Sequence, residues 1–68
     1  MGVVIPDELL DQRQTAAILG VVEATLERWR FARIGLPFIK VGRLVRYRRT
    51  DVARYLEQRT VKVDSQTK

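Results

Sequence analysis

Residues 11–32 read DQRQTAAILGVVEATLERWRFA, and this stretch decides the fold. Asp11 is a strong N-cap, and Gln14 stands three residues later, where its side chain can bond back to the cap in a capping box. Gly20 is expected to end the first helix, because glycine adopts the left-handed C′ conformation without a steric cost. A second helix is predicted to follow almost at once, over about residues 22–32. Two short helices joined by a glycine-containing turn predict a helix-turn-helix.

Both predicted helices place apolar or small side chains at helical spacing, which indicates one buried face on each. We expect this core to include Thr15, Ile18 and Leu19 from the first helix and Val22, Leu26 and Trp29 from the second. Val21, in the turn, is expected to pack back onto the first helix. Trp29 is interpreted as a core residue and is given no contact with a ligand.

The opposite side of the second helix is predicted to be exposed. It presents Ala24, Glu27 and Arg28, with Thr25 and Arg30 at its flanks. If this helix enters the major groove of DNA, its N-terminal half reads base edges. Arg28 can then fork onto guanine O6 and N7, whereas Thr25 and Ala24 suit a phosphate or a thymine methyl. Glu23 and Glu27 oppose this, because carboxylates repel phosphates. Either one of them accepts a cytosine amino group, or the segment that follows carries more of the affinity.

That segment is a predicted hairpin. Residues 34–37, Ile-Gly-Leu-Pro, are expected to form a loop, because proline restricts the residue before it to extended geometry and is excluded from central strands. Strand-like runs follow at residues 38–41 and 45–48, around the sequence Gly-Arg-Leu at 42–44.

Two registers are open to this hairpin. A two-residue loop pairs Val41 with Leu44 and mixes apolar and charged side chains on one face. A three-residue loop pairs Val41 with Val45 and makes one face wholly apolar, so we expect this second register. The other face then holds the cations Lys40, Arg46 and Arg48. Arg43 stands at the tip, where it can enter a minor groove, whose negative potential attracts arginine.

A last helix is predicted from near Thr50 to near Arg59. It carries Val52, Tyr55 and Leu56 at helical spacing and is expected to close the core over the first helix. Residues 9–59 are therefore predicted to form one small α+β domain, mainly α: a winged helix-turn-helix with three short helices and a two-stranded β-hairpin wing. Residues 1–8 are expected to form a flexible leader, and residues 60–68 a flexible tail.

The charge distribution indicates the partner. Residues 28–49 hold seven arginines and one lysine and no acidic residue, so eight of the thirteen cations of the chain lie in 22 positions. This is the footprint of a protein that binds a polyanion, and double-stranded DNA fits best. A basic surface without a partner and an adaptor for an acidic protein are alternatives. An anionic membrane is a weaker one, because it requires a long amphipathic helix.

Composition argues against several other classes. The chain of 68 residues has no Cys and no His, and its acids lack metal-loop spacing, so neither a metal nor another cofactor is expected. The chemistry of an enzyme would depend on Ser, Thr, Lys or isolated carboxylates, so no catalytic residue is assigned. No segment approaches the roughly 20 apolar residues of a membrane span. The opening residues lack the basic region of a signal peptide, so a cytoplasmic location is expected.

A set of short motifs occurs in order along the chain. They are Leu-Gly-Val at 19–21, Thr-Leu at 25–26, Arg-Trp at 28–29, Leu-Pro at 36–37, Lys-Val-Gly at 40–42 and Val-Arg-Tyr-Arg at 45–48. In these motifs, residues 9–59 resemble the excisionase-type, MerR-like winged helix-turn-helix family of phages and mobile elements. The resemblance implies a recombination directionality factor: several copies bind repeated sites in an attachment region, bend the DNA and direct the integrase toward excision and away from integration.

By position, the resemblance places Thr25 and Arg28 on the recognition helix, Arg43 at the wing tip, and Lys40, Arg46 and Arg48 on the wing strands. Two departures stand out. Val22 occupies a position where the family usually has a capping Ser, and Glu23 and Glu27 stand where polar or basic residues are commoner. The alternative is a small phage or prophage transcriptional regulator with the same fold. The excisionase is preferred because 68 residues leave no room for a sensor domain.

Overall fold

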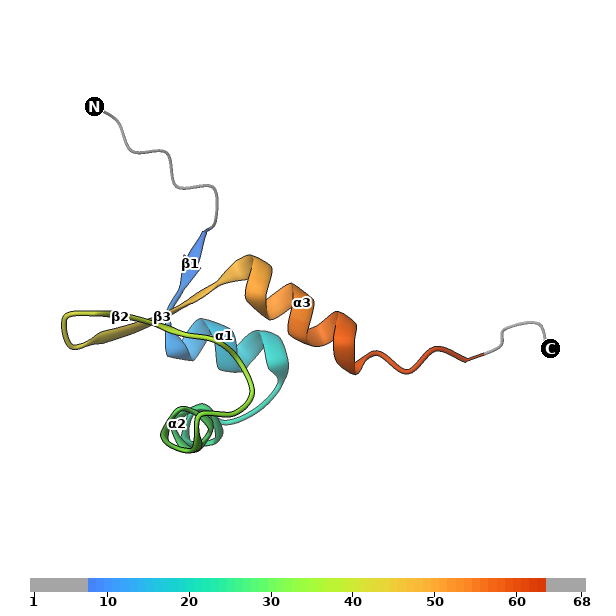
Figure 1. Cartoon of the computed structure of the whole chain (residues 1–68), viewed down its shortest axis with the longest axis horizontal. Coiled ribbons are helices and arrows are strands. Elements are labelled where there is room, and N and C mark those ends of the chain that lie inside the picture. Colours follow the sequence, from blue (N-terminus) through green and yellow to red (C-terminus); the bar gives the residue numbers. More distant parts are fainter. Residues whose placement is uncertain (1–7, 64–68) are drawn as a thin grey trace, which may run out of the picture.

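The computed structural model describes residues 8–63 (Figure 1). Its elements follow the order β1 (Leu9–Leu10), α1 (Gln12–Leu19), α2 (Glu23–Ala32), β2 (Ile39–Val41), β3 (Leu44–Arg48) and α3 (Arg49–Arg59). The strands pair antiparallel in the order β1-β3-β2. The β2–β3 hairpin projects from one side of the molecule and α3 from the other (Figure 1). Three helices with a hairpin wing confirm the predicted winged helix-turn-helix.

The first helix and its turn form as the sequence predicts. The Asp11 carboxylate accepts the Gln14 backbone N–H at 2.8 Å, and the Gln14 side-chain oxygen accepts the Asp11 backbone N–H at 2.9 Å. These two bonds complete the capping box. Gly20 ends α1 in the left-handed region, with φ 72°, and the Val21 N–H then bonds to the Ala16 carbonyl. This sharp reversal brings α2 back against α1.

The core receives one or two side chains from every element except β2, and one more from the loop after α2. Its buried apolar members are Leu10, Ala16, Leu26, Leu36, Tyr47 and Val52. The polar Thr15 is also fully buried beside these residues, and its hydroxyl donates to the Asp11 carbonyl at 2.8 Å. Trp29, Val21 and Leu19 pack against this core while partly exposed, in agreement with the prediction.

Three of the residues predicted for the core lie largely outside it. Ile18 is 43% exposed, Val22 68% and Leu56 41%. In α1 the small Ala16 lies in the core, so the buried stripe is centred on Thr15 and Ala16 and is rotated away from Ile18. Val22 is the N-cap of α2 and has extended backbone, so its side chain does not continue the helical stripe.

The predicted register of the wing is wrong. The hairpin has a two-residue loop, with Val41 opposite Leu44 and Lys40 opposite Val45. Gly42, with φ 62°, takes the first central position of the turn, where glycine tolerates the positive φ that a tight hairpin requires. The argument for one wholly apolar face fails because the wing projects beyond the core. Only its base is covered, and Val41 and Leu44 are each about half exposed.

A third strand, absent from the prediction, completes the sheet. β1 pairs Leu10 with Tyr47 and Leu9 with Arg48. The Glu8 carbonyl also accepts the Arg49 backbone N–H at 2.9 Å. Leu10 and Tyr47 therefore share the face of the sheet that is covered by the core, and both are almost fully buried.

The last helix follows β3 without a loop, and its Val52 is buried in the same core cluster as Ala16 of α1, as predicted. The Tyr55 ring lies 5.6 Å from the Trp29 ring, so α3 also covers the end of α2. Residues 1–7 of the predicted leader and residues 64–68 of the predicted tail lie outside the described residues.

Candidate nucleic-acid interface

One face of α2 is turned away from the core. Ala24, Glu27, Arg28 and Phe31 follow one another at helical spacing, and all four are exposed. Leu26 and Trp29 lie on the opposite side, where Leu26 is 1% exposed. Thr25 and Arg30 are half-buried at the flanks of the face. The periodicity argument therefore placed the exposed side chains of α2 correctly.

The two acidic residues of α2 are engaged by α1. The Gln12 side-chain amide donates to Glu23 at 2.9 Å and to Glu27 at 3.0 Å. Its oxygen accepts a bond of 2.6 Å from Arg30, whose guanidinium also donates to the Tyr47 hydroxyl at 2.8 Å. One glutamine thus cross-links α1 to α2, and Arg30 extends the network to β3. Glu27 and Arg30, both predicted to contact DNA, therefore have structural partners within the domain.

The wing presents its cations on two faces rather than one. Lys40 lies opposite Val45 and shares the face of Val45 and Tyr47, whereas Arg46 lies opposite Ile39 on the other face. Arg48 is adjacent to Tyr47 in β3, so its side chain lies on the face opposite Tyr47, which is the face of Arg46. The prediction that all three cations share a face falls with the predicted register. Lys40 is consequently the wing-strand cation directed to the side on which α2 lies.

The arginines of the wing strands also differ in how they are held. Arg46 donates to the Val45 carbonyl at 2.8 Å and is half-buried. Arg48 lies 3.6 Å from the Asp51 carboxylate. Arg43, at the exposed hairpin tip, makes no ion pair or side-chain hydrogen bond within residues 8–63, and the same holds for Arg28 and Lys40. Among the cations predicted to contact DNA, these three are the most available to an external anion.

Two residues that the sequence analysis did not single out lie on this side of the molecule. Phe31 is 92% exposed on the same stripe as Arg28, and helical spacing alone could have identified it. Arg33 caps α2 in the left-handed region, with φ 60°. Arg33 belongs to the basic run over residues 28–49, but no sequence signal indicates its left-handed backbone, because glycine is the residue expected at such a position.

The described residues show no arrangement for metal binding. Over residues 8–63, His, Cys, Asp and Glu form no group of three that could hold a metal ion. In the same part of the chain, no helix is long and apolar enough to cross a bilayer.

The comparisons with known proteins agree with this geometry. Residues 9–60 match a family described as "Helix-turn-helix domain". This family includes excisionase-like DNA-binding domains, and its members are typically not enzymes. No curated protein and no solved structure shows a significant match to the chain.

Proposed function

This chain belongs to the helix-turn-helix domain family and so to a family of DNA-binding domains, and from that premise we propose that it is an excisionase. In this role it binds attachment-site DNA, bends it, and directs the integrase of a phage or mobile element toward excision and away from integration. The partners are the integrase and further copies of this protein side by side on repeated sites. The observation that carries the proposal is the acid-free basic run over residues 28–49, which spans both α2 and the wing.

The recognition helix supplies the sequence-reading contacts. Arg28, exposed at the middle of α2, forks onto guanine O6 and N7. Ala24 and Thr25, one turn earlier, contact a thymine methyl or a phosphate. Glu27 contributes less, because its carboxylate already accepts the Gln12 amide. Arg30 serves chiefly to hold α2 against β3 through Tyr47.

The wing supplies contacts that do not read bases through hydrogen bonds. Arg43 enters the minor groove beside the major groove that holds α2, and favours narrow, AT-rich sequence. Lys40 binds phosphates on one face of the wing, and Arg46 and Arg48 bind phosphates on the other face. Bending a site of 20–30 base pairs by 40–90° costs about 1–6 kcal/mol. Phosphate contacts from several adjacent protomers offset that cost.

Recombination with purified components tests this proposal. The cognate integrase is supplied with both pairs of attachment sites, with and without this protein. We expect the protein to recombine nothing alone, to stimulate excision and to inhibit integration. Binding should also be cooperative on clustered repeats, and circular-permutation mobility should reveal the bend. If neither direction of recombination changes while a nearby promoter responds, the protein is instead a transcriptional regulator with the same fold.

A further inference from the structure

Between α2 and the wing lies an open hollow of about 520 Å³. Its walls carry three cations, two aromatic rings and one carboxylate: Arg30, Arg33, Lys40, Phe31, Phe38 and Glu27. The hollow is flanked by the exposed face of α2 on one side and by β2 on the other. Two of the wall residues, Phe31 and Arg33, have features that packing within the domain does not explain.

The first feature is the exposure of Phe31. A phenylalanine that is 92% exposed makes almost no contact within residues 8–63, so the fold gains little from its ring. Its neighbours in the hollow include Arg33 and Lys40, which make no ion pair or side-chain hydrogen bond in the described part of the chain. An apolar ring between cations suits a partner that is itself both apolar and anionic.

The second feature is the backbone of Arg33. Arg33 ends α2 with φ 60° and ψ 44°, as Gly20 ends α1 with φ 72° and ψ 30°. Glycine adopts this conformation freely, whereas a residue with a Cβ is strained in it. The bonds from the Arg33 N–H to the Trp29 and Arg30 carbonyls are backbone bonds that glycine would also make. Glycine would therefore keep these bonds without the strain, and only the arginine side chain would be lost. The presence of arginine at a strained position points to a function for its side chain.

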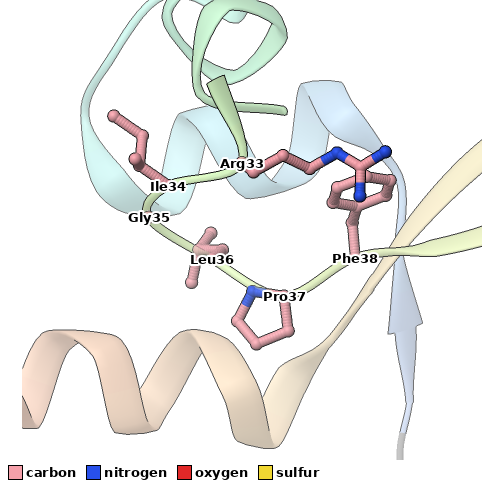
Figure 2. Close-up of a pocket in the computed structure, with 6 residues that line it drawn as sticks. All are labelled: Arg33, Ile34, Gly35, Leu36, Pro37 and Phe38. Carbon is pink, nitrogen blue, oxygen red and sulfur yellow. The ribbon is translucent and has the colours of Figure 1, made fainter. Parts of the chain in front are cut away.

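The side chain of Arg33 extends back over the loop. In the view of Figure 2 the Arg33 side chain runs in the direction of Phe38, while Ile34 and Leu36 point elsewhere. Arg33 and Phe38 line both the hollow between α2 and the wing and the adjoining one of about 400 Å³ along residues 33–38. Arg33 therefore adds a positive charge to the hollow that Lys40 also lines.

DNA geometry supplies a partner with both properties. When α2 occupies a major groove and Arg43 the neighbouring minor groove, the sugar–phosphate strand that separates these grooves has to cross the surface between them. Its deoxyribose rings are largely apolar and its phosphates are anionic. We propose that the hollow binds this strand, with Arg33 and Lys40 contacting phosphates and Phe31 packing on a deoxyribose. The inference rests on the DNA-binding part of the proposed function and is independent of the choice between excisionase and regulator.

Arg33→Gly is the sharpest variant, because it removes the guanidinium while it relieves the left-handed strain. We expect its thermal midpoint to equal or exceed that of the wild type. Loss of one phosphate contact lowers the slope of log K against log[salt] by about 0.9, which at about 0.1 M salt is roughly an eightfold loss of affinity. The loss should be the same for a specific duplex and a random one. Arg54→Ala, which removes a cation from the exposed side of α3, is the matched charge control.

Phe31→Ala separates the apolar contact from the ionic one. We expect roughly a tenfold loss of affinity, with an unchanged salt slope, because the buried area is apolar. A duplex with a neutral methylphosphonate placed at successive positions then locates the phosphate. At that position the substitution should weaken the wild type but leave Arg33→Gly unaffected.

Three results would overturn the inference. If Arg33→Gly binds DNA with wild-type affinity and an unchanged salt slope, Arg33 makes no phosphate contact. A loss in Phe31→Ala that is confined to one sequence, and is reproduced by replacing thymine with uracil, makes Phe31 a base contact. Unchanged DNA binding with lost integrase binding makes the hollow a protein-docking site. Failure of the proposed function is distinct, because the wild type itself would then fail to bind DNA or to alter recombination.

Discussion

At the scale of single residues, Gly35 is the most tightly enclosed of the glycines that the structure describes. A Cβ at Gly35 would lie 2.6 Å from the Trp29 Cε3, and the residue has φ +81°. Gly20 has a similar φ of +72° but no atom within 4 Å of the same position. Gly35 is therefore required by both conformation and space, whereas Gly20 is required by conformation alone.

This pair yields a stability prediction. Gly20→Ala should lower the free energy of unfolding by about 1 kcal/mol, from backbone strain. Gly35→Ala should lower it by roughly 2–4 kcal/mol, because displacement of the Trp29 ring is added to that strain. Urea denaturation followed by tryptophan fluorescence measures both. Equal losses in the two variants would show that the Trp29 ring moves aside at no cost.

Arg28 and Arg43 should differ in what they read. Arg28→Ala should weaken binding to a specific site by about 1–3 kcal/mol more than binding to random DNA, if Arg28 forks onto a guanine. Arg43→Ala should act chiefly through AT-rich flanks, where groove shape attracts arginine. Competition gel shifts on matched duplexes compare them. Equal losses of specific and random binding in Arg28→Ala would reduce Arg28 to a phosphate contact.

At the scale of elements, the junction of α1 and α2 depends on a polar cross-link as well as on the core. Gln12 bonds Glu23, Glu27 and Arg30 at once. Gln12→Ala should lower the free energy of unfolding by about 1 kcal/mol, since these bonds are exposed or only part-buried. Arg13→Ala, at the exposed neighbour on α1, is the control and should change it by less than about 0.5 kcal/mol. An unchanged stability in Gln12→Ala would show that the cross-link does not hold the two helices together.

Elements with local signals were predicted from the sequence, and elements set by tertiary contacts were not. The capping box of α1 and the turn at Gly20 depend on residues within five positions of each other. β1 is only two residues long and exists because Leu10 pairs with Tyr47, far along the chain. The predicted register of the wing was wrong because the alternation of apolar and polar residues specifies a register only where one face of the strands is buried.

In the candidate site, too, features with local sequence signals were predicted and features set by tertiary contacts were not. Helical periodicity placed Ala24, Glu27 and Arg28 on the exposed side of α2. It could not show that Glu27 and Arg30 are bonded to Gln12, because those contacts join residues 15 and 18 positions apart. Phe31 was overlooked although it lies on the same stripe, since an aromatic residue at helical spacing is ordinarily assigned to a core.

At the scale of the whole molecule, stability depends on a core that takes very few side chains from each element. Leu26→Ala should therefore cost about 2–5 kcal/mol. That cost approaches the whole stability of many small domains, so the variant should be largely unfolded at 37 °C. Val22→Ala, at a position that is 68% exposed, is the matched control and should unfold like the wild type. Circular dichroism melts compare the two, and a cooperative wild-type melt for Leu26→Ala would contradict the described core.

The central claim is that α2, the wing and the hollow between them form one surface that binds the DNA backbone. The most direct measurement is the affinity for a DNA duplex as a function of salt, by fluorescence anisotropy. With about five or six phosphates contacted by each protomer, log K against log[salt] should have a slope of roughly −5. A slope near zero would contradict the account, because the unpaired cations of α2 and the wing would then have no part in binding.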